Sequence, residues 1–250
     1  MSGHSKWSTI KRKKGAADAK RGALFTKLSK QLVLAVREGG GGDPATNFKL
    51  RLAIQNARAA NMPNDNIERA IQKATGGGDS EKLEEVIYEG YGPGGIAILV
   101  SAVTDNRNRT VAEVRHEFTR AGGSLGEAGS VAWQFEPKGT LALPVNGTDP
   151  DELVLQAIDA GADDVQVQGE FVEVQTEPSS LEDVRRALET AGIDIEASDL
   201  AMVPKTTLEV DDTAARQTLR LLDGLEELDD VQRVYSNADF SDAALEAYAS

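Results

Sequence analysis

The sequence predicts an α+β protein, in which an N-terminal all-helical domain is followed by two α/β-sandwich (ferredoxin-like) domains, the last inserted into the middle one. Three observations support this fold class. Apolar side chains recur at helical spacing between Met1 and Gly78, strand-like apolar runs appear after Ser80, and residues 139–203 have the order β-α-β-β-α-β. At 250 residues, the chain is long enough for more than one domain.

The helical part contains three expected helices. The first begins near Lys20 and ends at four consecutive glycines, residues 39–42. Asp43 and Pro44 predict the cap and first turn of a helix over about 44–60. The apolar faces of the first and third helices are formed by Leu24, Leu28, Leu32 and Ala35, and by Ile67, Ala70, Ile71 and Ala74.

The middle part alternates strands and helices. Strands are expected at 86–88, 96–100 and 131–135, with a helix carrying Val111, Val114, Phe118 and Ala121 before the last of them. The C-terminal segments 207–210 and 231–235 read as strands around a helix with Ala215, Leu219, Leu222 and Leu225, but they have no partners of their own. We therefore expect them to complete the sheet of residues 84–136. The resulting domains are 1–80, then 81–137 with 205–250, and 138–204 as an insertion; the alternative is two consecutive domains after the helical one.

The inserted part reads as a complete unit. Strands are expected at 140–145, 165–168 and 171–176, and a last strand near 193–203. The helix over 149–160 should bury Leu153, Ala157 and Ile158. Ser179 and Glu182 resemble a capping box at the start of the second helix.

The charge of the chain is unevenly distributed. The segment from Met1 to Lys30 holds nine Lys or Arg and one acid, Asp18, a balance of +8, whereas the whole protein carries -14. Such a basic segment on an acidic protein indicates a nucleic-acid-facing end. Because lysine predominates, the pattern favours recognition of the phosphate backbone or of shape over a base code. In the alternative interpretation, the basic segment is an ordinary solvated helix surface. Trp7 can either anchor this segment to the helical domain or stack on a base.

A second basic spot lies where a strand leads into a helix. Arg107 and Arg109 are expected beside the free N–H groups of a helix N-terminus, a natural anion site. In the alternative interpretation, Asn108 and Thr110 cap the helix and the arginines pair with acids. The full candidate nucleic-acid-binding set is Lys6, Lys11, Arg12, Lys13, Lys14, Lys20, Arg21, Lys27, Lys30, Arg107 and Arg109.

Several function classes have no support in the residues. Gly90, Gly92 and Gly95 match a dinucleotide motif by count, but a strand follows them, so a hairpin turn is expected. The chain has no cysteine and two histidines, of which His116 is expected on an exposed helix face. Paired acids such as Asp229-Asp230 are expected to be solvated surface charge. We therefore expect no enzymatic activity, no cofactor and no metal, and a cytoplasmic protein that does not enter the membrane.

Long motifs resemble the YebC family, which includes the mitochondrial translational activator of cytochrome oxidase. They are Gly3–Trp7, Asn61–Ile67, Tyr88–Gly95, Asp105–Thr110 and Gly122–Gly126 with Gly129–Val131. The resemblance implies three domains, the last inserted into the second, and a cytoplasmic protein described as a DNA-binding regulator of transcription. The alternative that it implies is a ribosome-associated translation factor that contacts ribosomal RNA and assists elongation at proline-rich sequences. The partner is then DNA or ribosomal RNA, with the ribosome as a further partner, and the oligomeric state is open.

Overall fold

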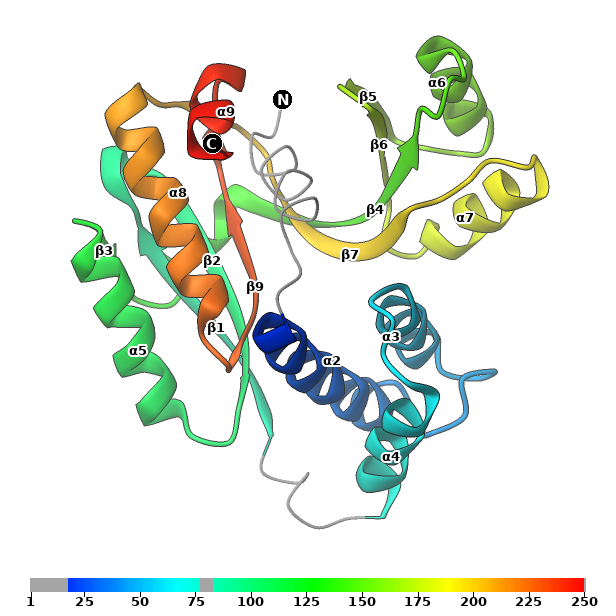
Figure 1. Cartoon of the computed structure of the whole chain (residues 1–250), viewed down its shortest axis with the longest axis horizontal. Coiled ribbons are helices and arrows are strands. Elements are labelled where there is room, and N and C mark those ends of the chain that lie inside the picture. The colour runs from blue at the N-terminus through cyan, green and yellow to red at the C-terminus, as the bar shows by residue number, and fades with distance from the viewer. Residues whose placement is uncertain (1–17, 77–82, 250) are drawn as a thin grey trace. The chain divides into compact units, whose positions relative to one another are not determined.

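A computed structural model describes residues 18–76 and 83–249 (Figure 1). The chain divides into two compact units. The insert unit is Phe135–Val203, and the main unit comprises residues 2–134 and 204–250. The sequence of the insert unit therefore interrupts that of the main unit. The further division of the main unit into a helical and a middle domain stays a prediction.

The helical part of the main unit consists of α2 (Asp18–Glu38), α3 (Phe48–Ala59) and α4 (Asn64–Thr75). Leu32 and Leu50 are fully buried in their shared core. The prediction that the second helix starts at Pro44 was wrong, because Asn47 is the N-cap of α3. Its Oδ1 accepts the Leu50 N–H at 2.9 Å, and its Nδ2 donates to the carbonyls of Ala35 and Gly41.

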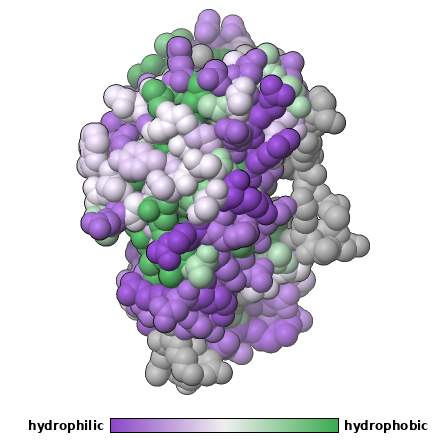
Figure 2. Space-filling model, turned by 90° about the vertical axis from the view of Figure 1, so that its left-hand side faces the viewer, coloured by the Kyte–Doolittle hydropathy of each residue, from purple (hydrophilic) through white to green (hydrophobic). Residues whose placement is uncertain are grey.

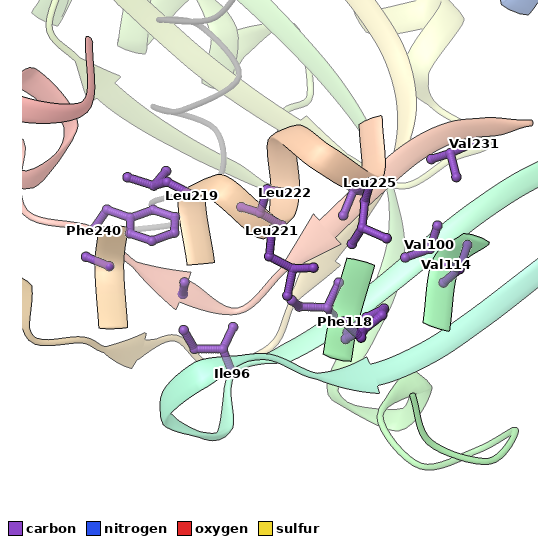
Figure 3. Close-up of a cluster of buried hydrophobic side chains, with 14 of the residues drawn as sticks. Ile96, Val100, Val114, Phe118, Leu219, Leu221, Leu222, Leu225, Val231 and Phe240 are labelled. Atoms are coloured by element: carbon purple, nitrogen blue, oxygen red, sulfur yellow. The ribbon is translucent and has the colours of Figure 1, made fainter. Parts of the chain in front are cut away.

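The sheet of the main unit has the order β3-β1-β2-β9. Its strands are β1 (Glu84–Tyr91), β2 (Ala97–Thr104), β3 (Ser124–Leu125) and β9 (Val231–Ser236). The antiparallel pairing of β2 with β9 confirms that the C-terminal segment 231–235 completes this sheet. One face packs against α5 (Arg107–Arg120) and α8 (Asp212–Glu227), and Figure 3 shows the apolar side chains that meet there.

Two strand predictions for this part were wrong in detail. The segment around Val131 is not a strand of the sheet: the turn η3 (Ala132–Gln134) leads directly into β4 (Phe135–Pro144) of the insert unit. Near the C-terminus, β8 (Leu208–Glu209) pairs in parallel with β10 (Ala238–Asp239), outside the four-stranded sheet. The chain then forms α9 (Asp242–Ala249), which the sequence pattern did not predict.

The glycine-rich segment between β1 and β2 forms the expected hairpin turn. The Gly92 N–H donates to the Ile96 carbonyl at 2.8 Å across the turn η2 (Pro93–Gly95). Gly90 has a packing reason, because a Cβ atom there would lie 2.6 Å from the Phe118 ring. These glycines therefore shape a turn and a tight sheet–helix contact, with no helix following as a dinucleotide site requires.

The insert unit has the predicted ferredoxin-like topology. Its sheet order is β5-β6-β4-β7, and both helices lie on the same side of it (Figure 1). The elements after β4 are α6 (Pro150–Asp159), β5 (Asp164–Gln168), β6 (Phe171–Thr176), α7 (Leu181–Thr190) and β7 (Ala197–Pro204).

Two predictions inside this unit were wrong. Ile158 is 53% exposed instead of buried, because Leu153 and Ala157 alone face the core from α6. The N-cap of α7 is Ser180, which makes no side-chain capping bond. Glu182 instead accepts from Arg185 at 2.8 Å, one turn further along the same helix.

Figure 2 views the molecule from the side that carries α5 in Figure 1. Its green areas are small and are separated by white and purple ones. The visible surface is therefore mostly polar, with the apolar side chains of α5 and α8 directed into the core shown in Figure 3.

Candidate nucleic-acid interface

The predicted basic residues fall into two groups. Lys6, Lys11, Arg12, Lys13 and Lys14 lie outside the described residues, as does the side chain of Lys20 in the first turn of α2. The structure places the side chains of the remaining five: Arg21, Lys27, Lys30, Arg107 and Arg109. Arg21 is exposed on α2. Acidic or carbonyl groups of the main unit are contacted by Lys27, Lys30, Arg107 and Arg109.

Two lysines of α2 bind the segment that joins α8 to β9. Lys27 donates to the carbonyl of Glu226, which lies in the last turn of α8. Carbonyl groups at a helix C-terminus lack partners within the helix and attract a cation. Lys30 donates to the Asp229 carbonyl at 3.1 Å and to Asp230 Oδ1 at 2.7 Å. These lysines therefore serve an internal contact in this structure.

Asp230 is the centre of a buried polar cluster. Its residue surface is only 2% exposed, and Oδ2 accepts from Thr104 at 3.0 Å, Thr110 at 2.7 Å and Arg109 at 2.6 Å. We call Lys30, Thr104, Arg109, Thr110 and Asp230 the Asp230 cluster. Burial alone would raise the pKa of the Asp230 carboxyl, but the hydrogen bonds from Lys30, Arg109 and Thr110 outweigh burial and hold this pKa well below its usual range.

The cluster corrects the interpretation of Asp229-Asp230 as solvated surface charge. Asp229 is exposed, whereas Asp230, immediately before β9, is buried. The two neighbours have the same side chain, so composition could not separate them. The informative signal is position, since Asp230 stands immediately before the buried Val231.

The start of α5 differs from a free anion site. Asn106 is the N-cap and accepts the Arg109 N–H at 3.2 Å, so neither Asn108 nor Thr110 caps this helix. The Arg107 Nε lies 3.2 Å from a Glu84 carboxylate oxygen, and Arg109 also contacts Asp105 at 2.9 Å. This arrangement favours the interpretation in which both arginines pair with acids.

A second buried carboxylate fixes a loop that the sequence pattern had predicted as part of a strand. Glu89 of β1 is 7% exposed and accepts the N–H groups of Gly129, Val131 and Ala132 at 2.6, 2.8 and 2.7 Å. Burial would raise the pKa of this carboxyl, but the three backbone hydrogen bonds lower it below its ordinary value. Because these N–H groups point to Glu89, they are not available for a sheet ladder.

Comparisons with known proteins decide the family. A model of the TACO1/YebC N-terminal domain matches residues 5–77, and a model of the second and third TACO1/YebC domains matches residues 83–238. The chain belongs to the TACO1/YebC family. This confirms the resemblance that the sequence motifs indicated.

Relatives match this TACO1/YebC protein over its whole length. A "Probable transcriptional regulatory protein" of Dehalococcoides mccartyi strain CBDB1 is 54% identical over 250 residues, covering 100% of this chain and 99% of the relative. A protein of Rubrobacter xylanophilus with the same description is 54% identical over 246 residues, 98% of each chain. The crystal structure of a conserved hypothetical protein from Aquifex aeolicus has a TM-score of 0.84 at 46% identity, covering 90% of this chain and 93% of that one.

Within residues 18–76 and 83–249, no group of three His, Asp or Glu side chains could hold a metal ion. His116 is exposed on α5, as expected. None of the helices described is long and apolar enough to cross a membrane.

Proposed function

We propose that this TACO1/YebC protein is a non-enzymatic regulator of transcription that binds DNA through its basic N-terminal segment. The observation that carries the proposal is the separation of charge. The segment from Met1 to Lys30 has a balance of +8, and since the whole chain carries -14, the part from Gln31 to Ser250 has -22. The acidic remainder repels a polyanion, so the main electrostatic contact with the nucleic acid is assigned to the basic end.

The described contacts divide the candidate residues by role. Lys27, Lys30 and Arg109 are engaged by the main unit itself, and Arg107 pairs with Glu84. The phosphate contacts are therefore proposed first for the basic residues before them in the chain, Lys6, Lys11, Arg12, Lys13, Lys14 and Lys20. Arg21, which is exposed on α2, remains a further candidate. The four internally engaged residues would contact phosphate only if these bonds opened.

The names of the relatives support a role in transcription, because the curated proteins that resemble this chain are described as probable transcriptional regulatory proteins. We also propose a cytoplasmic location. Footprinting on genomic promoter fragments tests the proposal: we expect a defined protected sequence, and equal affinity for unrelated duplexes would contradict a sequence-directed regulator.

A second candidate function is that of a ribosome-associated translation factor with the basic segment on ribosomal RNA. The observation that favours it is composition: seven of the nine basic side chains between Met1 and Lys30 are lysine, which binds phosphate as a point charge and reads bases poorly. Sedimentation of a cell extract at low salt tests this candidate. Comigration with ribosomes that is lost at high salt is expected, and absence from the ribosomal fractions would contradict it.

A further inference from the structure

Trp133 is held in an exposed position. Its side chain belongs to the turn η3, and the residue is 67% exposed. The indole Nε1–H donates to the Ser130 carbonyl at 3.1 Å, so the donor of the ring is already satisfied. What the side chain offers to a partner is therefore the flat face of its ring, without a hydrogen-bonding requirement.

Hydrogen bonds with Glu89 and Lys205 fix the backbone of the loop that carries Trp133. Glu89 accepts three backbone N–H groups from the four residues that precede Trp133. The carbonyl of Trp133 accepts a hydrogen bond from the Lys205 ammonium at 2.9 Å, and the Lys205 N–H donates to the Gln134 carbonyl at 2.8 Å. The ring is thus attached to a backbone held on both sides, which lowers the entropic cost of binding a partner.

A second aromatic ring borders the same loop. The Tyr91 hydroxyl donates to the Ser130 carbonyl at 2.9 Å, the same oxygen that accepts the Trp133 N–H. In β1, Tyr88 and Gly90 face the core with Phe118, so Ile87, Glu89 and Tyr91 face the opposite side of the sheet. Ile87 and Tyr91 are exposed there, beside the loop that Glu89 holds.

The charge of Lys205 favours a nucleotide over an apolar protein surface as the partner of Trp133. Lys205 is exposed, and its ammonium has three N–H donors, of which the Trp133 carbonyl accepts one. An ammonium bound to the backbone carbonyl of an exposed aromatic residue can reach the phosphate of a nucleotide whose base stacks on that residue's ring. A purely apolar protein partner would have no use for the ammonium.

We propose that Trp133 is a stacking site for one unpaired nucleobase, with Tyr91 at its edge and Lys205 near the adjoining phosphate. This inference rests on the proposed function, since it assumes that the protein binds nucleic acid. It adds that the bound nucleic acid presents an unpaired base, because bases inside a duplex are covered by their neighbours. An RNA loop and a melted DNA segment share this chemistry.

The chain has two tryptophans, Trp7 and Trp133. Tryptophan fluorescence can therefore report on Trp133 alone once Trp7 is replaced. In a Trp7→Phe variant, the remaining emission comes from Trp133. The probes are a 12-nucleotide oligo(U), a 12-nucleotide oligo(dT) and a 20-base-pair DNA duplex, all labelled with fluorescein so that anisotropy reports binding independently. Trp133→Ala and Trp133→Phe variants are compared with the wild type, and Trp133→Phe serves as the conservative control that keeps a ring.

We expect both single strands to quench Trp133 and the duplex to bind without quenching it. Trp133→Ala should lose about 5- to 150-fold of single-strand affinity, the equivalent of roughly 1–3 kcal/mol for one stacked base, while duplex affinity stays unchanged and Trp133→Phe recovers most of the loss. Quenching by oligo(U) alone assigns the base to RNA, and equal quenching by oligo(dT) assigns it to single strands in general.

The outcomes separate this inference from the proposed function. Anisotropy that shows single-strand binding without quenching of Trp133, or an unchanged affinity of Trp133→Ala, overturns the stacking site and leaves nucleic-acid binding intact. No anisotropy change with any probe overturns both. Loss of duplex binding in Trp133→Ala, in parallel with single-strand binding, shows a structural role for the ring and also contradicts the stacking site.

Discussion

Lys30 of α2 binds Asp230 at 2.7 Å, although 200 positions of sequence separate the two residues. Through this pair, a basic residue of the N-terminal helix is bound to a buried carboxylate beside β9. Arg109 contacts the other oxygen of the same carboxylate at 2.6 Å. Two residues that the sequence suggests as separate phosphate contacts therefore meet on one internal acid.

Asp230→Ala should lower the free energy of unfolding by about 3–5 kcal/mol, the cost of removing one partner from a buried ion pair. The variant leaves Lys30, Thr104 and Thr110 without their shared acceptor. Urea unfolding followed by circular dichroism measures this change. Asp229→Ala is the matched control, because its side chain is exposed, and we expect a change within about 0.5 kcal/mol. Equal losses of stability in the two variants would contradict a stabilising role of the Asp230 cluster.

Stability should fall in acid more steeply than exposed carboxyls can explain. The pKa values of Asp230 and Glu89 are lowered by folding, whereas the unfolded side chains titrate near about 3.9 and 4.3. In acid the unfolded chain therefore binds more protons than the folded one. The stabilisation is complete above about pH 5 and is lost as the pH falls through the folded-state pKa values.

The double variant Asp230→Asn with Glu89→Gln tests the acid prediction. Its stability at pH 7 is lower, but the slope of unfolding free energy against pH between about 5 and 2.5 should be flatter than in the wild type. Urea titrations at a series of pH values give both slopes. Parallel slopes would show that other carboxyls cause the acid sensitivity.

Gly90→Ala should destabilise the main unit by about 1–3 kcal/mol, as overpacking of a tight core does. The added Cβ would lie 2.6 Å from a Phe118 ring atom and 2.7 Å from the Ser124 carbonyl oxygen. Gly22→Ala in α2 is the opposite case, because nothing lies within 4 Å of its Cβ position. There we expect a gain of about 0.5–1 kcal/mol from helix propensity. Thermal unfolding of both variants measures the two signs.

Apolar periodicity predicted the layers of the fold because burial follows local spacing. Leu28 and Leu32 face the helical core as expected, and Phe118 faces the main sheet. Leu24, predicted on the same helix face, is 43% exposed instead. The carboxylates could not be predicted in this way, because their partners are distant. Glu89 binds a loop that lies far along the chain, at Gly129 to Ala132, and Asp230 binds residues from α2, β2 and α5.

Contacts with distant residues also explain why the strand prediction for the loop before the insert unit was wrong. Val131 to Phe135 has the composition of a strand, but the Glu89 carboxylate takes two of its N–H groups and turns the segment into η3. Trp133 lies on the surface in this segment. The candidate stacking site is formed by tertiary contacts and could not be predicted from the sequence. The basic segment, in contrast, can be identified from the charges in the sequence alone.

Binding of a DNA duplex at several salt concentrations tests whether the basic N-terminal segment contacts nucleic acid. The affinity for a 20-base-pair duplex is determined by anisotropy at several salt concentrations for the wild type and for Lys11→Glu/Arg12→Glu/Lys13→Glu/Lys14→Glu. The control with the same change of charge is Arg115→Glu/Arg186→Glu/Arg216→Glu/Arg220→Glu, since these four arginines are exposed on other helices. We expect the duplex affinity of the wild type and of the control to fall with salt at a slope of about -0.9 per phosphate contacted, and the segment variant not to bind. Unchanged affinity of the segment variant, or equal losses in both variants, would contradict a nucleic-acid contact of the basic segment.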